Sequence, residues 1–266
     1  MNLRRSYFLG FILFTCGLFH CQGGAEQSTN RKIRVFAAAS TAEVLEEIID
    51  SFTLKTHIAV SLNVASSGTL ARQIAQGAAA DVFLTADPKW LRYLDSVGYL
   101  NQAAAVDVAK NALVLVQPTD APAYPFPAGQ RLASFPSLDS LLSLASTQRL
   151  AIGDPTHVPL GRYTVQALRN RGQYTAIQDR LLLAKDARAV LRLVELGETA
   201  LGIIYRTDAG RSKRVHILAD CPMAYHDPII YKAAPTQPSL AKEFLAYLTT
   251  QDVKSIWAKY HFEPID

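Results

Sequence analysis

The sequence predicts an α/β protein built on parallel β-sheets, and two observations carry that prediction. Apolar runs of strand length alternate with segments whose apolar residues recur at helical spacing, the pattern of a parallel sheet covered on both faces by helices. Three turns at predicted strand-to-helix junctions are short and rich in neutral hydrogen-bond donors: one ends at Ser40, one spans residues 66–69 and one spans residues 153–161. Helix N-termini converging on one point form an anion site.

The first part of the chain contains three strand–helix units. Residues 33–38 form a continuous apolar run, as a buried parallel strand requires, and residues 43–52 carry an apolar helical stripe. The remaining elements of this part are predicted strands at 58–64 and 81–86, a helix at 70–76 and a helix that begins at Pro88.

A second series of units begins with a predicted strand at residues 111–116. The proline-rich stretch 118–127 is typical of an irregular surface connection, and residues 239–259 form a long closing helical region. The elements between them are predicted strands at 149–152, 201–205, 215–218 and 229–233, and helices at 161–169 and 187–196.

The N-terminus has the organisation of an export signal. Arg4 and Arg5 precede an apolar run over residues 7–19, which has the length of a signal h-region and is short for a membrane span. Cys21 closes this run, so residues 1–21 are predicted to be a signal peptide of the lipoprotein type with lipidation at Cys21. Residues 22–30 would then be a flexible tether. Ordinary cleavage near this point and an uncleaved anchor remain alternatives.

Composition limits what holds the fold together and what it binds. Two of the three cysteines lie in the signal, so Cys221 has no partner for an intramolecular disulfide and the fold must rest on its core. The formal net charge is +4, and the basic residues are scattered among acidic ones without a basic block. This distribution predicts that the protein does not bind nucleic acid.

Four motifs in order make the chain resemble the periplasmic molybdate-binding proteins of ABC importers. They are VFAAAS, ASSGTLARQIAQGAAADVFLTADPKW, RLAIGDPTHVPLGRY and ALGIIY, and the likeness covers most of residues 33–261. The resemblance implies the class II periplasmic binding protein fold, in which two parallel-sheet-rich lobes joined by a two-stranded hinge close on one tetrahedral oxyanion. It implies lobe 1 at residues 31–110 and 211–266 and lobe 2 at residues 111–210.

The resemblance also implies which groups hold the oxyanion. Ser40 and Ser67 match the two serines that donate hydroxyl groups, and Tyr205 at the end of ALGIIY matches the tyrosine. Leu160 and Ala187 stand at the positions that donate backbone N–H groups, where the family commonly has Ala and Val. A backbone donor survives both changes.

A site made only of neutral donors suits molybdate and tungstate, which carry no proton at neutral pH. Hydrogen phosphate must donate a proton, and an unpaired buried polar group costs about 1–3 kcal/mol. Sulfate would have to be rejected by cavity size. The resemblance implies that the ligand is molybdate or tungstate, with no cofactor. Gly68 stands where the family often has Ser, which removes one possible hydroxyl.

The expected function is capture of the oxyanion outside the cytoplasm by a monomer that passes it to an ABC permease in the inner membrane, without any reaction. A receptor for sulfate or another tetrahedral oxyanion is the first alternative. An exported hydrolase with Ser40 or Ser67 as nucleophile is another, disfavoured because neither serine lies in a G-x-S-x-G or an S-x-x-K motif. A ligand-sensing domain of a regulator is a third, disfavoured because no DNA-binding segment accompanies it.

Several of these residues also have purely structural explanations. Ser40 and Glu43 have the spacing of a capping box, Ser67 could be a turn serine and Tyr205 a tyrosine at the core edge. Asp87 and Trp90 are expected to cap and pack a helix, and Asp186 to cap the helix that begins at Ala187. Asp154 and His157 are expected to be structural, His226 and Asp227 to lie at the surface, and Cys221 to be non-catalytic.

Overall fold

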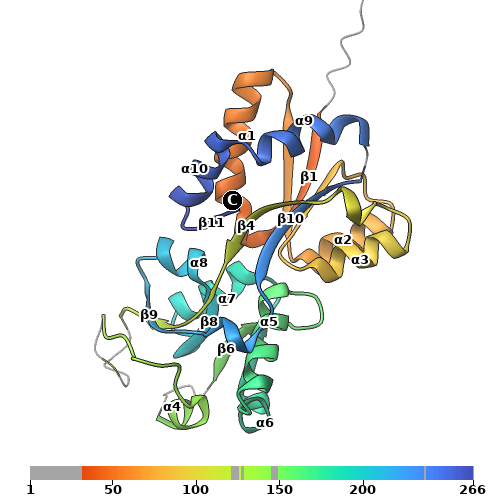
Figure 1. Ribbon diagram of the computed structural model, residues 1–266. Helices are drawn as coiled ribbons and strands as arrows, with labels where there is room; N and C mark the ends of the chain where they lie inside the picture. The colour runs from red at the N-terminus through yellow and green to blue at the C-terminus, as the bar shows by residue number, and fades with distance from the viewer. Residues whose placement is uncertain (1–31, 121–125, 127–128, 145–148, 237, 266) are drawn as a thin grey trace, which may run out of the picture. The chain divides into compact units, whose positions relative to one another are not determined.

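Two mixed β-sheets with helices packed around them organise the computed structural model (Figure 1). The structure describes residues 32–120, 126, 129–144, 149–236 and 238–265. The predicted signal peptide, the tether and Cys21 lie outside the described residues. Among the helices of the described part, none is long and apolar enough to cross a membrane.

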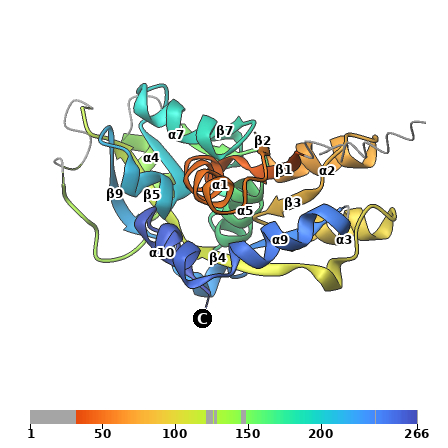
Figure 2. The ribbon, with the colours of Figure 1, turned by 90° about the horizontal axis from the view of Figure 1, so that it is seen from above.

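The first sheet and its helices form lobe 1. Its strand order is β11-β4-β10-β3-β1-β2, in which β1 is parallel to β2 and β3 while β10 is antiparallel to β3 and β4. The strands are β1 (Ile33–Ala38), β2 (Val60–Ala65), β3 (Val82–Thr85), β4 (Val106–Asn111), β10 (Ile229–Pro235) and β11 (Glu263–Pro264). The helices are η1 (Ala39–Thr41), α1 (Ala42–Thr56), α2 (Ser67–Ala75), α3 (Pro88–Ser96), η2 (Gln102–Ala104), α9 (Pro238–Leu248) and α10 (Gln251–Lys259). Helices α2 and α3 pack against each other (Figure 1), and seen from above both lie at the right-hand end of the view (Figure 2).

The second sheet and its helices form lobe 2. Its strand order is β7-β6-β8-β5-β9, in which β6 is parallel to β7 and β8 while β5 is antiparallel to β8 and β9. The strands are β5 (Leu113–Pro118), β6 (Leu150–Gly153), β7 (Leu181–Ala184), β8 (Leu201–Tyr205) and β9 (Val215–Asp220). The helices are α4 (Leu138–Leu144), α5 (Pro159–Asn170), α6 (Tyr174–Ile177), η3 (Gln178–Arg180), α7 (Ala187–Glu195), α8 (Arg206–Arg211) and η4 (Met223–Tyr225).

The chain crosses between the two sheets twice. It leaves the first sheet at the end of β4 and enters the second at Leu113, and it returns between the end of β9 and the start of β10. The predicted two-lobed α/β fold is confirmed, with sheets that are mixed rather than dominated by parallel pairs. The antiparallel pairs arise because β4, β5, β9 and β10 flank the two crossings.

One predicted boundary needs correction. The return to lobe 1 was placed at residue 211, but β9 pairs antiparallel with β5 in the second sheet, with Ile217 opposite Val116. Residues 215–220 therefore belong with lobe 2, because this apolar strand covers the open edge of the fully buried β5.

Most predicted elements are present, with shifts at their ends. The strand expected at 58–64 is β2, and the closing helical region is two helices, because a new helix begins after Thr250. The strand expected from residue 111 begins at Leu113, because Asn111 ends β4. The predictions missed β4, β7, β11, α4, α6 and α8. Of the proline-rich stretch, residues 121–125 and 127 lie outside the described residues.

Candidate functional site

The five residues predicted to hold the ligand line one small cavity between the two lobes. Ser40 and Ser67 come from lobe 1, and Leu160, Ala187 and Tyr205 come from lobe 2. The rest of the lining is Ala38, Ala39, Ser66, Ala86, Val158 and Pro159. The free space is small, since the centre of a water-sized sphere can occupy only about 10 Å³ of it. It is a site for a compact ligand.

Three α-helices begin at this cavity. Helix α2 begins at Ser67, α5 at Pro159 and α7 at Ala187, so each presents N–H groups of its first turn that have no acceptor within the helix. Ser66 caps Thr69 N in α2 and Asp186 caps Ala189 N in α7, whereas the N-cap of α5 makes no side-chain cap. The N–H groups of Leu160 and Ala187 lie in these first turns. They supply partial positive charge without a cation.

The three hydroxyl groups predicted to donate to the ligand are all buried. Ser40 is 2 % exposed, Ser67 0 % and Tyr205 1 %. Ser67 Oγ accepts a hydrogen bond from Ala86 N at 3.3 Å, which leaves its own hydrogen free to donate. Tyr205 OH has no hydrogen-bond partner among the described residues. Burial raises the pKa of Tyr205 well above its ordinary value, so this hydroxyl stays protonated and can only gain a partner by donating to, or accepting from, a ligand.

Ser40 is oriented by a residue that the sequence analysis missed. Its Oγ lies 2.8 Å from Tyr231 OH, and Tyr231 OH also accepts from Asn111 Nδ2 at 3.2 Å. Tyr231 lies in β10 beside the crossing at Asn111. An isolated tyrosine in an apolar strand gives no sequence signal of this role, since the partner lies 191 positions away.

The structure rules out the predicted capping box. The N-cap of α1 is Thr41, which makes no side-chain cap, and Ser40 lies one residue earlier in η1. The Glu43 carboxylate forms ion pairs with Arg188 and Arg211 of lobe 2 instead of turning back to the helix start. Ser40 Oγ is therefore not used as a helix cap.

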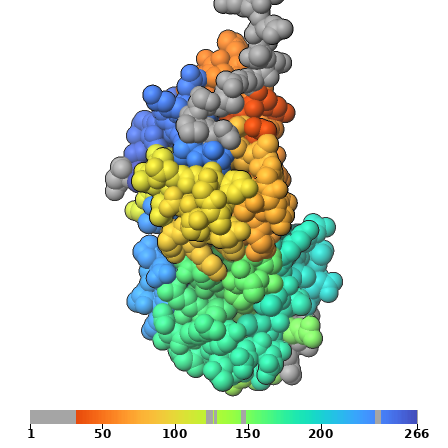
Figure 3. Space-filling view, turned by 90° about the vertical axis from the view of Figure 1, so that its right-hand side faces the viewer, coloured from red at the N-terminus to blue at the C-terminus, as the bar shows by residue number. Residues whose placement is uncertain are grey.

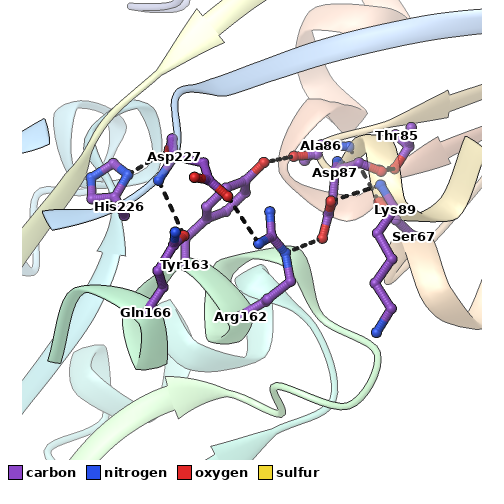
Figure 4. Close-up of polar contacts among 10 residues, drawn as sticks. All are labelled: Ser67, Thr85, Ala86, Asp87, Lys89, Arg162, Tyr163, Gln166, His226 and Asp227. Carbon is purple, nitrogen blue, oxygen red and sulfur yellow. Dashed lines mark hydrogen bonds and ion pairs between the residues drawn. The ribbon is translucent and has the colours of Figure 1, made fainter. Parts of the chain in front are cut away.

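The two lobes contact each other directly beside the cavity (Figures 3 and 4). Gly68 N donates to His157 O at 3.0 Å, and Tyr163 OH donates to Ala86 O at 3.1 Å. The Arg162 guanidinium forms an ion pair with Asp87. Asp87 caps α3 as expected, through Lys89 N at 2.9 Å, and the ion pair is an additional role.

The remaining candidates do not line the cavity. Asp154 accepts from Thr156 in its own turn, 3.7 Å from His157 Nδ1, and Asp186 is the expected N-cap. Burial raises the pKa of the Cys221 thiol to about 11, so it is protonated at neutral pH. In the part of the chain that the structure describes, no group of three or more His, Cys, Asp or Glu side chains is placed to hold a metal ion.

The expectation that His226 and Asp227 are both at the surface is wrong for His226. His226 is only 6 % exposed, and its Nδ1 lies 2.8 Å from Asp227 O. Its ring packs edge-on against Tyr163, which explains the burial, and burial lowers its pKa. The Asp227 side chain is exposed.

Comparison with known proteins gives the family. The sequence pattern of the bacterial extracellular solute-binding proteins matches residues 33–263. The chain is 36% identical to the molybdate-binding protein ModA of Escherichia coli over 87% of this chain and 88% of that one. It is 30% identical to the Bacillus subtilis protein YvgL, whose name describes an ABC transporter substrate-binding lipoprotein, over 94% of both chains.

Solved structures share the fold. The periplasmic molybdate-binding protein of Azotobacter vinelandii superposes with a TM-score of 0.71 at 22% identity, covering 88% of this chain and 100% of that one. The sulfate-binding protein SubI of Mycobacterium tuberculosis also gives 0.71, at 16% identity, covering 88% and 87%. Two lobes that enclose a cavity lined by neutral donors define a solute-binding protein. The chain belongs to the bacterial extracellular solute-binding protein family.

Proposed function

We propose that this protein is an extracytoplasmic receptor that captures molybdate, and tungstate with it, and delivers the anion to the permease of an ABC importer. The observation that carries the proposal is the Tyr205 hydroxyl, which is buried at the cavity and has no hydrogen-bond partner among the residues that the structure describes. A ligand oxygen would satisfy it. The likeness to ModA of E. coli supports the choice of anion.

In the proposed complex, the ligand accepts hydrogen bonds from five groups. Ser40 and Ser67 donate hydroxyl hydrogens from lobe 1, and the Tyr205 hydroxyl and the N–H groups of Leu160 and Ala187 donate from lobe 2. Hydrogen bonds to a charged acceptor are about twice as strong as neutral ones. Because the donors belong to both lobes, the ligand binds the closed arrangement better than any open one and shifts the population toward it.

The protein would capture without reaction and without a cofactor. The hydrogen-bond partners of Ser40 and Ser67 are Tyr231 OH and Ala86 N, neither of which is a general base for a nucleophile. We infer a monomer, held outside the cytoplasm by a lipid on Cys21. The name of its relative YvgL, a lipoprotein, supports that anchor.

A receptor for sulfate is the second candidate. The same neutral donors would satisfy sulfate, which also carries no proton at neutral pH, and the small free space favours a compact anion. Size alone would distinguish the two ligands.

Calorimetric titration of the protein without residues 1–21 tests these proposals. The ligands are molybdate, tungstate, sulfate and phosphate, each also titrated into Arg169→Gln as a control that leaves the cavity intact. Tight one-to-one binding of molybdate and tungstate with weak sulfate is expected. Tight sulfate binding would favour the sulfate receptor instead. If no oxyanion binds, both proposed functions are wrong.

A further inference from the structure

We propose that Arg162 is a positioning residue that couples anion capture to closure of the two lobes through its ion pair with Asp87. The inference rests on the proposed function, in which the anion contacts both lobes. Arg162 does not line the cavity. It would act through the contact between α5 of lobe 2 and the start of α3 of lobe 1 (Figure 4).

The ion pair can exist only when the lobes are together. Asp87 belongs to lobe 1 and is 1 % exposed, while the Arg162 side chain of lobe 2 is 28 % exposed. One Asp87 oxygen, Oδ1, accepts from Lys89 N, and the other, Oδ2, accepts from Arg162 Nε. If the lobes separated, Asp87 Oδ2 would lose Arg162 and be hydrated instead, so the ion pair stabilises only the closed arrangement.

The same helical turn carries the ligand donor and the ion pair. Leu160 and Arg162 are both in the first turn of α5, two residues apart. A helix is rigid over that distance, so α5 cannot bring the Leu160 N–H to the anion without bringing Arg162 to Asp87. The Arg162 guanidinium is also held over the Tyr163 ring, 4.2 Å from its centre, which fixes its direction.

In lobe 1, the segment before α3 contributes both to the cavity and to the ion pair between Asp87 and Arg162. Ala86 lines the cavity and its N–H donates to Ser67 Oγ, while Ala86 O accepts from Tyr163 OH. Asp87 follows directly. A shift of this segment that broke the ion pair would also move the N–H that orients Ser67.

Arg162 also reaches the segment through which the chain returns to lobe 1. Its Nη1 lies 3.4 Å from Asp227 Oδ2, and Gln166, one turn further along α5, accepts from Asp227 N at 3.1 Å. Asp227 lies between β9 and β10, in the second crossing. Helix α5 thus holds the crossing and Asp87 with side chains from one face.

Dissociation kinetics with molybdate as the ligand test the coupling. For Arg162→Gln we expect the dissociation rate constant to rise about ten- to a hundred-fold with an association rate constant close to wild type, since the pair forms after encounter. Asp87→Asn keeps an N-cap acceptor for Lys89 N but removes the charge, and should have the same effect. Arg162→Lys should recover part of the loss.

The matched control is Arg169→Gln on the same helix, because Arg169 lies over Tyr174 within lobe 2. It should leave both rate constants unchanged. The double variant Asp87→Asn/Arg162→Gln should dissociate no faster than either single one. Thermal unfolding without ligand establishes that each variant is folded.

The outcomes separate the two proposals. If the wild type binds molybdate but Arg162→Gln dissociates at the wild-type rate, the proposed role of Arg162 is wrong and the proposed ligand stands. The same conclusion follows if the effects of the two substitutions are additive in the double variant. Absence of molybdate binding in the wild type overturns the proposed ligand and the coupling with it.

Discussion

The hydroxyl groups of Ser40 and Tyr231 lie 2.8 Å apart, and the direction of the hydrogen bond between them follows from a third residue. Asn111 Oδ1 accepts from Ala112 N at 2.9 Å, which turns Asn111 Nδ2 toward Tyr231 OH. Tyr231 accepts there, so its single hydrogen is available to Ser40 Oγ. The hydrogen of Ser40 is then free to point into the cavity.

This arrangement predicts that Tyr231→Phe weakens anion binding although Tyr231 does not line the cavity. Without Tyr231 OH, Ser40 can turn its hydrogen to other acceptors, and we expect the dissociation constant to rise about five- to tenfold, the value of one neutral hydrogen bond. Ser40→Ala should cost more, because it removes the donor itself. Calorimetry on both variants checks the order, which the reverse ranking would contradict.

Tyr205→Phe should have opposite effects on stability and on binding. In the ligand-free protein it removes a buried hydroxyl to which no described residue bonds, so the free energy of unfolding should stay level or rise. In the complex it removes a hydrogen bond to an anion, worth about 1.5–3 kcal/mol, so the dissociation constant should rise about ten- to a hundred-fold. Urea unfolding without ligand and calorimetry measure the two effects. A variant that loses stability and keeps affinity would contradict the role of Tyr205.

Gly68→Ala should obstruct closure. A Cβ at Gly68 would lie 2.6 Å from His157 O of lobe 2 and 2.4 Å from Trp90 Cζ2 of lobe 1. Overpacking of this kind costs about 1–3 kcal/mol, and the lobes can relieve the first contact by staying apart. We expect affinity to fall at least about fivefold on this basis.

The control for that prediction is Gly68→Ala/Trp90→Phe, which relaxes the contact within lobe 1 and keeps the one with His157. Its affinity, measured by calorimetry, should stay low. Full recovery would show that the packing of Trp90, and not closure, is responsible. The same crowding explains why a serine hydroxyl is missing here: the structure has no room for any side chain at this position.

Asp208 predicts a pH dependence of stability. Burial raises the pKa of its carboxyl from the ordinary 3.8 to about 7. The nearby charge of Asp186 also raises this pKa, whereas the charges of Arg211 and Arg188 lower it. The folded state therefore holds a proton between about pH 4 and pH 7 that the unfolded state has lost. The free energy of unfolding should fall by on the order of 4 kcal/mol across this window and level off above it.

Asp208→Asn removes this titration, so the variant should lose less stability than the wild type between pH 5 and pH 8. Urea unfolding of the ligand-free protein at both values measures the difference. Equal slopes in the two proteins would contradict the assignment to Asp208.

The sequence was sufficient for the alternation of strands and helices because that signal is local. The continuous apolar runs at β1 and β8 and the stripe of α1 report burial within one element. The turns at Ser40 and Ser67 could be predicted for the same reason, since each is a strand end followed closely by a helix start, and the turn before Leu160 is a short loop of residues 154–158 between β6 and α5.

The assignment of strands to the two sheets and the partners of the site residues depend on contacts between distant segments. The place of β9 in the second sheet is decided by pairing with β5, about a hundred residues earlier, and no local pattern distinguishes the two sheets. The partners of Ser40 and Asp87 lie 191 and 75 positions away. Ser40 and Glu43 satisfied a capping-box pattern that the structure does not use, because Tyr231 and two arginines of lobe 2 compete for these side chains.

Because uncharged residues line the cavity, the ionic strength of the surrounding solution should have little influence on it. Mobile ions screen exposed charges over a Debye length of about 8–10 Å, but they do not reach buried N–H and hydroxyl dipoles. None of the described residues that line the cavity is a cation that chloride could neutralise, and the raised pKa of Tyr205 keeps its hydroxyl protonated near neutrality. Capture of a dianion by this cavity should therefore change little with ionic strength.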